Sequence, residues 1–322
     1  MSYGRVNKPR FFPDAVNWLA SRGWSKESYL ALANQNFTAG STIYQLFDLN
    51  PLNTATIDTS GESGEAIITI DFTVTANMPI TFVAILNHNL NTAASLCFLQ
   101  SDTAAITDYD ALEINSLTPL IGCTSSVGGV SCAADGDLIA TCTATNERYH
   151  AIVLKADGAN FADDITIGSI IVGSHYTLPN SGDLNVQRDF SFDGVTVRST
   201  DGGKRYGHAS WVAGNDGNDY APFREQAYIR RPGGRQAYDI NFSYIADTEL
   251  FGDDLSDNDT ETDFFYQVPN KTAGPLLPFI WTPDSTSTTE GDYLFARLMN
   301  DFKPQKVANR VWSFKNRIEE EL

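Results

Sequence analysis

His88 is the residue whose type and position most invite a chemical role. It ends the apolar run of ITFVAILNHNL, residues 80–90, between Asn87 and Asn89. A histidine can act as a general base, ligate a metal or hydrogen-bond a turn, but no catalytic or ligating partner stands at motif spacing from this one. Asparagine side chains commonly close turns on the backbone. We therefore predict that Asn87, His88 and Asn89 form a structural turn at a strand end.

The remaining histidines and the cysteines are isolated from one another in the sequence. The cysteines lack the CxxC spacing of zinc sites, and in a chain without an export signal we expect reduced thiols. A disulfide between Cys123 and Cys132 stays open as an alternative. The sequence predicts no metal and no cofactor. The residues concerned are Cys97, Cys123, Cys132, Cys142, His150, His175 and His208.

Three other segments carry residues that enzymes or ligand sites use. The glycine-rich segment 199–211 lacks the GxxxxGK[ST] spacing of a phosphate loop. The acidic run 251–263 does not have a glycine and a closing glutamate at the spacing of a calcium loop, so we expect a solvated loop. No Ser-His-Asp or Cys-His pattern is present, although paired carboxylates of a glycan hydrolase remain an alternative. We expect a protein that is not an enzyme.

The charge of the chain is strongly negative and unevenly distributed. Forty acidic and 22 basic side chains give a net charge of −18, which argues against nucleic-acid binding. Residues 27–147 contain no Lys or Arg, whereas residues 197–235 contain seven. Patches of opposite sign suit contacts between copies, although two solvated faces are an equal alternative. The predicted interface cations are Lys204, Arg205, Arg224, Arg230, Arg231 and Arg235.

Short apolar runs dominate the chain from residue 41. They are rich in Ile, Val, Thr and Phe and separated by Gly, Asn, Asp and Pro, as in antiparallel sandwiches. Apolar side chains at successive positions of residues 80–86 predict a strand that is covered on both faces. The polar segment 100–136 is expected to be a long excursion between strands. The predicted strands lie within residues 42–50, 65–74, 80–87, 149–156 and 164–178.

The two ends of the chain differ from this central part. In DAVNWLASRGW, residues 14–24, apolar residues at helical spacing are followed by Gly23, a helix stop signal. Residues 1–40 are expected to form an arm with a short helix. Beyond residue 180, Asp193 and Gly194 predict a hairpin within RDFSFDGVTVRS. A turn in IRRPGGRQAYDINFSYI, a strand in PLLPFIWTPD, and a final strand with a charged tail in RVWSFKNRIEEEL follow.

Two groups of motifs carry resemblances to known families. QLFDLNP, ITFVAILNHNL and DDITIGSIIVGSHYTLP together resemble the galactose-binding-like jelly roll of the discoidin type. The continuation YTLPNSGDLNVQRDFSFDGVTVRSTDGGKRYG is similar to virion proteins of tailed bacteriophages, and GGRQAYDINFSYI, PFIWTPD and IEEEL look like parts of a tail-tip or baseplate component. The resemblance implies an all-β chain: an N-terminal jelly-roll β-sandwich (41–180) after the arm or helix (1–40), then a second, smaller β domain (181–322).

We accordingly expect a virion structural protein that is made in the host cytoplasm and acts at the tail tip or baseplate. Such a protein works through extended surfaces, so its partners would be copies of itself in a ring or other homo-oligomer, and other tail proteins. We expect neither nucleic-acid binding nor a membrane span. One alternative is a carbohydrate-binding module for host surface glycans, with Trp211 or Tyr220 in the ligand loop. The other is the glycan hydrolase.

Overall fold

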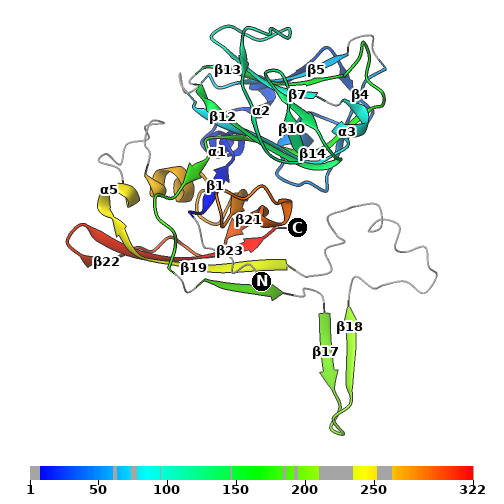
Figure 1. The fold of residues 1–322 in the computed structure, drawn as a ribbon. Coiled ribbons are helices and arrows are strands. Elements are labelled where there is room, and N and C mark those ends of the chain that lie inside the picture. Colours follow the sequence, from blue (N-terminus) through cyan, green and yellow to red (C-terminus); the bar gives the residue numbers. More distant parts are fainter. Residues whose placement is uncertain are drawn as a thin grey trace.

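The computed structural model of this chain describes residues 8–60, 64–73, 78–94, 96–145, 147–183, 186–191, 195–209, 235–251 and 263–321. These residues form antiparallel sheets of seven, six, eight and two strands. Figure 1 shows the first two sheets packed into one body, the third in a second body, and the two-stranded sheet standing away from both. The all-β prediction is confirmed, with helical segments of at most seven residues in the described part.

Two sheets packed face to face form the N-terminal jelly-roll sandwich. The first has the order β10-β11-β7-β13-β5-β2 with β8 beside β7, and the second has the order β3-β4-β14-β6-β12-β9. The strands of the first sheet are β2 (Leu30–Ala33), β5 (Glu65–Asp71), β7 (Leu96–Asp102), β8 (Ile114–Asn115), β10 (Cys123–Ser125), β11 (Val130–Cys132) and β13 (Tyr149–Lys155). Those of the second are β3 (Asn36–Phe37), β4 (Ala55–Asp58), β6 (Ile80–His88), β9 (Thr118–Ile121), β12 (Gly136–Thr145) and β14 (Ile165–Gly173).

Strand β6 lies in the centre of the second sheet, between β14 and β12. Its side chains Val83 and Ile85 point into the core between the two sheets, while Phe82, Ala84 and Leu86 belong to a separate apolar cluster on the outer face. All of them are buried. The predicted strand with two covered faces is therefore confirmed.

The N-terminal segment ties the two bodies together instead of forming a free arm. Strand β1 (Arg10–Pro13) pairs with strands of the second domain, and helix α1 (Ala15–Ser21) buries its apolar face in the jelly-roll core. The Asp14 side chain caps this helix by accepting from the backbone N–H of Asn17 at 2.7 Å. Helix α2 (Lys26–Tyr29) then leads into β2. The predicted short helix is confirmed, and the chain around it belongs to both bodies.

The second domain is one antiparallel sheet with the order β15-β1-β20-β21-β23-β19-β16, and β22 pairs with β23. Its aromatic core includes Phe264, Trp281 and Phe314. Helical segments α5 (Asp247–Leu250), η3 (Tyr266–Asn270, a π-helical turn) and η4 (Glu290–Asp292) lie in the connections. The strands are β15 (Tyr176–Thr177), β16 (Gln187–Ser191), β19 (Arg235–Ala246), β20 (Phe279–Thr282), β21 (Leu294–Leu298), β22 (Gln305–Ala308) and β23 (Val311–Glu320).

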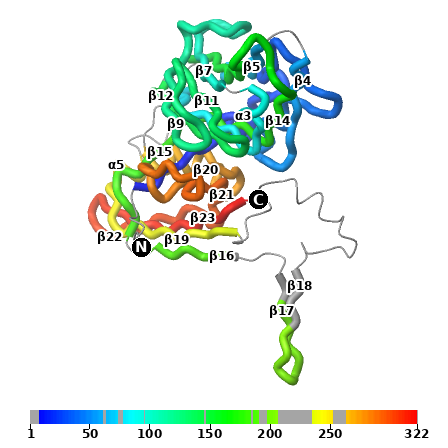
Figure 2. The backbone as a smooth tube through the Cα atoms, turned by 45° about the vertical axis from the view of Figure 1, so that its right-hand side comes forward, coloured from blue at the N-terminus to red at the C-terminus, as the bar shows by residue number. Residues whose placement is uncertain are grey.

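The two domains share an apolar interface. The outer face of the jelly-roll sheet at Phe82 meets Phe12 of β1, with ring centroids 5.1 Å apart, and Phe12 also lies 6.1 Å from the ring of Tyr293. A side chain at Gly173 would collide with the Pro13 carbonyl, because an added Cβ would lie 2.4 Å from its oxygen. Close packing of this kind joins the domains into one unit, and Figure 2 shows the two bodies next to each other.

Four predicted strands are confirmed as β5, β6, β13 and β14, but the strand predicted within residues 42–50 is wrong. That segment forms a 3-10 turn, η1 (Gln45–Phe47), which places the adjacent side chains Leu46 and Phe47 together in the jelly-roll core. The Asp48 carboxylate then accepts from the backbone N–H of Asn50 at 2.8 Å. A local side-chain bond of this kind competes with strand pairing.

Three further predictions need correction. The segment 100–136 is not a plain excursion, because β8, β9, β10 and β11 lie within it. The strands around Asp193 and Gly194 do not pair with each other: β16 pairs with β19, and β17 (Val195–Ser199) pairs with β18 (Arg205–Ala209). At the C-terminus the strand continues to Glu320, so Arg317 and Glu319 lie within the sheet and not in a tail. Residues 192–194 and the turn predicted at residues 229–234 lie outside the described residues.

Candidate functional site

The hairpin of β17 and β18 projects from the body of the protein. It forms a two-stranded sheet of its own, and Figures 1 and 2 both show it standing away from the two domains. Its tip is closed by Thr200, whose N–H donates to the Lys204 carbonyl at 2.9 Å. Gly203, with φ of +78°, provides the left-handed backbone that the tight turn needs.

The hairpin tip presents cations on an acidic chain. All side chains from Val197 to Arg205 are exposed, including those of Arg198 and Lys204. Asp201 is the single anion in this stretch. An isolated two-stranded hairpin is only marginally stable in water, and Val197 here is 60% exposed. A hairpin with this composition gains stability when a partner covers it.

The predicted interface cations fall into three groups. Lys204 and Arg205 lie at the hairpin tip, as described above. Arg235 begins β19 and lies 3.6 Å from a carboxylate oxygen of Glu319 on β23, so it contributes to its own sheet. The predicted residues Arg224, Arg230, Arg231, Trp211 and Tyr220 lie outside the described residues.

His88 and its flanking asparagines lie at the end of β6. Asn87 adopts a left-handed backbone with φ of 51°, and its side chain donates to the Pro51 carbonyl at 2.7 Å. The Asn89 amide donates to the Asp164 carbonyl and accepts from the Thr166 N–H, both at 2.8 Å. The two asparagine side chains therefore fasten the end of β6 to the backbone of neighbouring segments.

The His88 ring is buried and neutral. The Leu90 N–H donates to its Nδ1 at 3.1 Å, which places the ring proton on Nε2, and Nε2 has no hydrogen-bond partner among the described residues. Burial lowers the pKa of His88 to about 4, although the charge of Asp135 opposes this shift. A neutral ring with an occupied Nδ1 and a buried Nε2 is poorly suited to shuttle protons to a substrate.

His150 and His175 have similar environments at different places in the fold. Burial lowers the pKa of each to about 4, and their Nδ1 atoms lie 2.9 Å from the Ser101 hydroxyl and 2.7 Å from the Thr81 hydroxyl. In the described part of the chain, no three His, Cys, Asp or Glu side chains gather as a metal site.

A cleft of about 200 Å³ opens on the jelly-roll surface beside Tyr29 and Tyr149. Both tyrosines are half-buried, and Tyr29 stacks on the buried ring of Trp24 at 5.5 Å. Tyr29 ends helix α2 immediately before β2, and Tyr149 begins β13. Strand β5 lies between β2 and β13 in the first sheet. The cleft thus has aromatic walls on a fixed framework.

Asp71, which lines this cleft, belongs to an ion pair. The Arg148 guanidinium donates to both carboxylate oxygens of Asp71, at 2.8 and 3.0 Å, and lies 4.7 Å from the centre of the Tyr149 ring. This hydrogen bonding to Asp71 raises the pKa of Arg148. An aromatic ring beside a bidentate ion pair can stack on a sugar ring while the polar atoms bond its hydroxyls.

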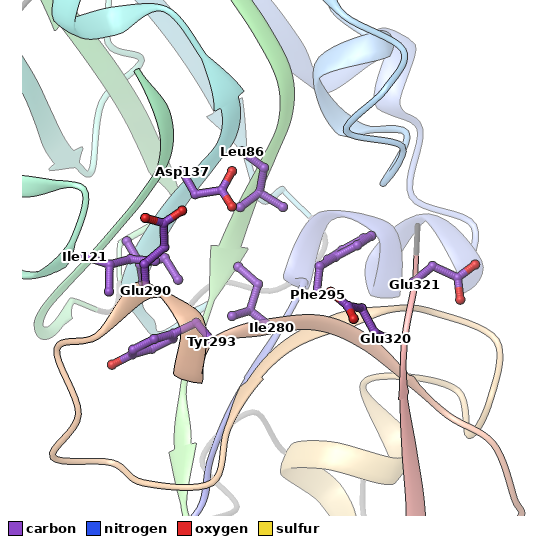
Figure 3. A pocket seen from close by; sticks show the side chains of 10 residues that line it. Leu86, Ile121, Asp137, Ile280, Glu290, Tyr293, Phe295, Glu320 and Glu321 are labelled. Atoms are coloured by element: carbon purple, nitrogen blue, oxygen red, sulfur yellow. The ribbon is translucent and has the colours of Figure 1, made fainter. Parts of the chain in front are cut away.

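A second, smaller cavity lies between the two domains (Figure 3). Asp137 and Leu86 reach it from the jelly roll, and Glu290, Tyr293 and Glu320 from the second domain. Its volume is about 20 Å³, which is the size of a single water site. Several of its carboxylates already bond to the chain; Glu320, for example, accepts from the Gln236 N–H at 2.9 Å. This cavity is too small for an organic ligand.

A third, shallow cleft of about 410 Å³ lies on the second domain, over β19 and β23. Its lining includes Asn241, Asn300 and Lys315. The aromatic side chains beneath it, Phe242 and Phe314, are buried, so they offer no free ring face to a ligand. Among these three spaces, it is the Tyr29–Tyr149 cleft that combines partly exposed aromatic rings with an ion pair, which makes it the best candidate for a ligand site.

The likenesses to known proteins concern solved structures. No protein-family model matches the chain, and no curated protein matches it. One similar structure is chitosan-binding module 1 of a chitosanase/glucanase from Paenibacillus sp. IK-5, with 14% identity, coverage of 45% of this chain and 93% of that chain, and a TM-score of 0.31. Another is CBM32-1 of a family 31 glycoside hydrolase from Clostridium perfringens, with 12% identity, coverage of 45% and 94%, and a TM-score of 0.33. A third is the β-galactosidase BgaA of Streptococcus pneumoniae, with 7% identity, coverage of 45% and 96%, and a TM-score of 0.31. At these TM-scores the likeness assigns no ligand to this chain.

Sequence reasoning missed the Tyr29–Tyr149 cleft for an identifiable reason. Arg148 is the first residue after the long interval without Lys or Arg, so the composition of that interval gives no sign of a cation in this domain. The partner of Arg148, Asp71, lies 77 positions earlier. The pairing follows from the register of β5 and β13, in which Tyr149 stands opposite Asp71, and no local motif contains both Arg148 and Asp71.

Among the described residues, no helix is long and apolar enough to cross a membrane.

Proposed function

We propose that this protein is a non-enzymatic assembly protein that binds other proteins through the β17–β18 hairpin. The observation that carries the proposal is an exposed, cationic hairpin on a chain whose net charge is −18. Its partner surface would be acidic, either on another copy of this chain or on a neighbouring protein. Complementary charge accelerates and orients such encounters.

The finer part of the proposal is a role in the tail tip or baseplate of a tailed-bacteriophage virion, after synthesis in the host cytoplasm. It is supported by the resemblance of residues 176–207 and of the C-terminal motifs to such proteins. Strand β17 and the first part of β18 lie within the first of these segments. An arm that extends beyond a compact body is suited to bridge neighbouring subunits of a ring or collar.

Charge reversal at the hairpin tip tests the proposal. The triple variant Arg198→Glu, Lys204→Glu and Arg205→Glu is expected to abolish self-association, measured by light scattering after gel filtration, or incorporation into phage particles. Its circular dichroism is expected to stay unchanged, because these side chains are exposed. Wild-type association is expected to weaken as salt rises above physiological strength, where the Debye length is about 8 Å.

A matched control variant reverses the charge of three basic residues on the second domain. Lys303, Lys306 and Arg310 are exposed on the second domain, so changing all three to Glu alters the net charge equally without touching the hairpin. This variant is expected to assemble like the wild type. Normal assembly of the hairpin variant, or a wild-type protein that is monomeric and absent from particles, would overturn the proposal.

A second candidate function, recognition of a glycan, is favoured by the Tyr29–Tyr149 cleft. Its volume of about 200 Å³ is below the ~300–1,000 Å³ of typical small-molecule sites, so it suits the end of a short glycan. We expect the wild type to bind weakly to a glycan array, and we expect Tyr149→Ala to abolish this binding. Tyr244, an 80% exposed tyrosine of the second domain, supplies the control Tyr244→Ala. Hydrolysis of the bound glycan would contradict the non-enzymatic assignment.

A further inference from the structure

Cys123 and Cys132 face each other across the β10–β11 hairpin. They are register partners in this antiparallel pair. The Ala133 N–H donates to the Gly122 carbonyl on one side of them, and hydrogen-bonded pairs alternate along an antiparallel ladder. The cysteines therefore occupy a non-hydrogen-bonded position, where Cα atoms lie about 4.5 Å apart. That distance is within the ~4.4–6.8 Å that a disulfide spans.

The two thiols lie on the same side of their sheet. Cys132 belongs to the core between the jelly-roll sheets, and Cys123 packs against that core. Burial raises the pKa of Cys132, and the charge of a Cys123 thiolate adds to this shift. Both thiols also add to the raised pKa of the buried Cys97, so the strand register and not this coupling selects the pair. Neither cysteine is bonded to another in this structure.

The other two cysteines are less well placed. Cys97 on β7 stands opposite Val130, so it is a diagonal neighbour of Cys132, and diagonal neighbours lie about 7–8 Å apart. Cys142 lies on β12 in the opposite sheet, and its thiol contacts the Ile80 carbonyl at 3.6 Å. The register thus singles out one pair.

We propose that Cys123 and Cys132 form an oxidation site, at which glutathione disulfide or a similar disulfide oxidant joins them across the hairpin. The inference is independent of the proposed assembly function, because it rests on the register of β10 and β11 alone. It makes the edge of the first jelly-roll sheet responsive to the passage of the protein from a reducing into an oxidising environment.

The exchange takes place in two balanced steps. The Cys123 thiolate attacks one sulfur of glutathione disulfide, and one glutathione leaves as a thiolate. The Cys132 thiolate then attacks the Cys123 sulfur, which forms the protein disulfide and releases the second glutathione. Cys123 is the better first nucleophile, because it is half-buried where Cys132 is buried.

The reaction is slow near neutrality and accelerates with pH. Burial raises the pKa of Cys123 to about 11 and that of Cys132 to about 12, and the thiolate is the attacking species. Between pH 7 and 9 the thiolate fraction of each rises roughly tenfold per pH unit. The oxidation rate is expected to rise similarly.

The test uses the full chain and glutathione disulfide at pH 9, with folding monitored by circular dichroism. The wild type is expected to lose two of its four titratable thiols and to keep no bound glutathione. Cys132→Ser is expected to retain one glutathione, attached to Cys123, because the second step is blocked. Cys97→Ser and Cys142→Ser are the matched controls, and both are expected to lose two thiols like the wild type.

Two results would overturn the inference. One is a folded wild-type protein that keeps all four thiols after prolonged exposure to the oxidant at pH 9. The other is a loss of thiols that Cys97→Ser or Cys142→Ser prevents, since the bond would then involve a different pair. Failure of hairpin β17–β18 to bind a partner has no bearing on either result.

Discussion

Strand β6 and the hairpin β17–β18 are both antiparallel β-structure, but their environments are opposite. β6 has a neighbouring strand on each edge and an apolar cluster on each face. The hairpin strands pair with each other, and the side chains described from Val197 to Arg205 are exposed. Burying an aliphatic side chain is worth roughly 1.5–3 kcal/mol, so β6 contributes greatly to stability and the hairpin tip very little. The hairpin tip is consequently free to vary for binding.

Placing an aspartate at an aliphatic position in each of the two regions gives the largest expected difference. Ile85→Asp places a charge in a fully buried apolar site, where its uncompensated desolvation is expected to unfold the jelly roll. Val197→Asp makes the same chemical change on the hairpin and is expected to leave the melting temperature unchanged. Thermal melts by circular dichroism compare them. A wild-type melting temperature for Ile85→Asp would show that β6 is not covered as described.

Acidification probes the buried region without mutation. His88 and His150 have pKa values of about 4 in the folded protein, below the ~6.5 of an unfolded histidine. The unfolded chain therefore binds more protons between pH 6.5 and 4, so stability is complete above pH 6.5 and falls as pH decreases toward 4. The loss is on the order of 3 kcal/mol for each ring.

Melting temperatures measured between pH 7 and 4 test this dependence. Burial raises the pKa of Asp14, and Asp102 raises that of Glu113 although the hydrogen bond from Gln100 opposes this shift. Both carboxyl groups act in the opposite direction, whereas the lowered pKa of His175 acts in the same direction as those of His88 and His150. The variant His150→Gln is expected to reduce the slope. A melting temperature that stays constant from pH 6.5 to 4.5 would contradict the burial of these rings.

The domain interface is the next most sensitive region. Phe12→Ala removes the ring that contacts Phe82 and Tyr293, and truncation of a buried Phe typically costs about 3–5 kcal/mol. Because this ring joins the two domains, a single calorimetric transition is expected to separate into two. Phe190→Ala, at a 47% exposed phenylalanine of edge strand β16, is the control. One unchanged transition for Phe12→Ala would show that the domains are not coupled through this ring.

Local patterns predicted the jelly-roll strands well and long-range pairing poorly. The β-rich runs at residues 80–87 and 164–178 became β6 and β14 because their burial is evident from composition. The hairpin signal at Asp193–Gly194 failed because β16 pairs with β19, which begins 44 positions beyond the end of β16. Pairing over such a distance depends on the packing of the whole sheet. The Arg148–Asp71 pair in the candidate cleft escaped prediction for the same reason.

The smallest expected effect concerns His88, at the end of β6. In His88→Asn, the amide oxygen can accept the Leu90 N–H in place of Nδ1, and the amide NH2 group takes the place of the buried Nε2–H, which lacks a partner among the described residues. Because the bond to Leu90 is kept, the loss of ring volume is expected to cost at most about 1 kcal/mol.

Urea denaturation measures this change against His88→Ala, which removes the acceptor as well as the ring. Ala leaves the Leu90 N–H without its bond, at a further cost of about 1–3 kcal/mol. If Asn and Ala were equally destabilising, the bond to Leu90 would not be what holds the turn. The role of His88 would then lie in ring packing at the end of β6, and the difference between this buried strand and the exposed hairpin would rest on apolar contacts alone.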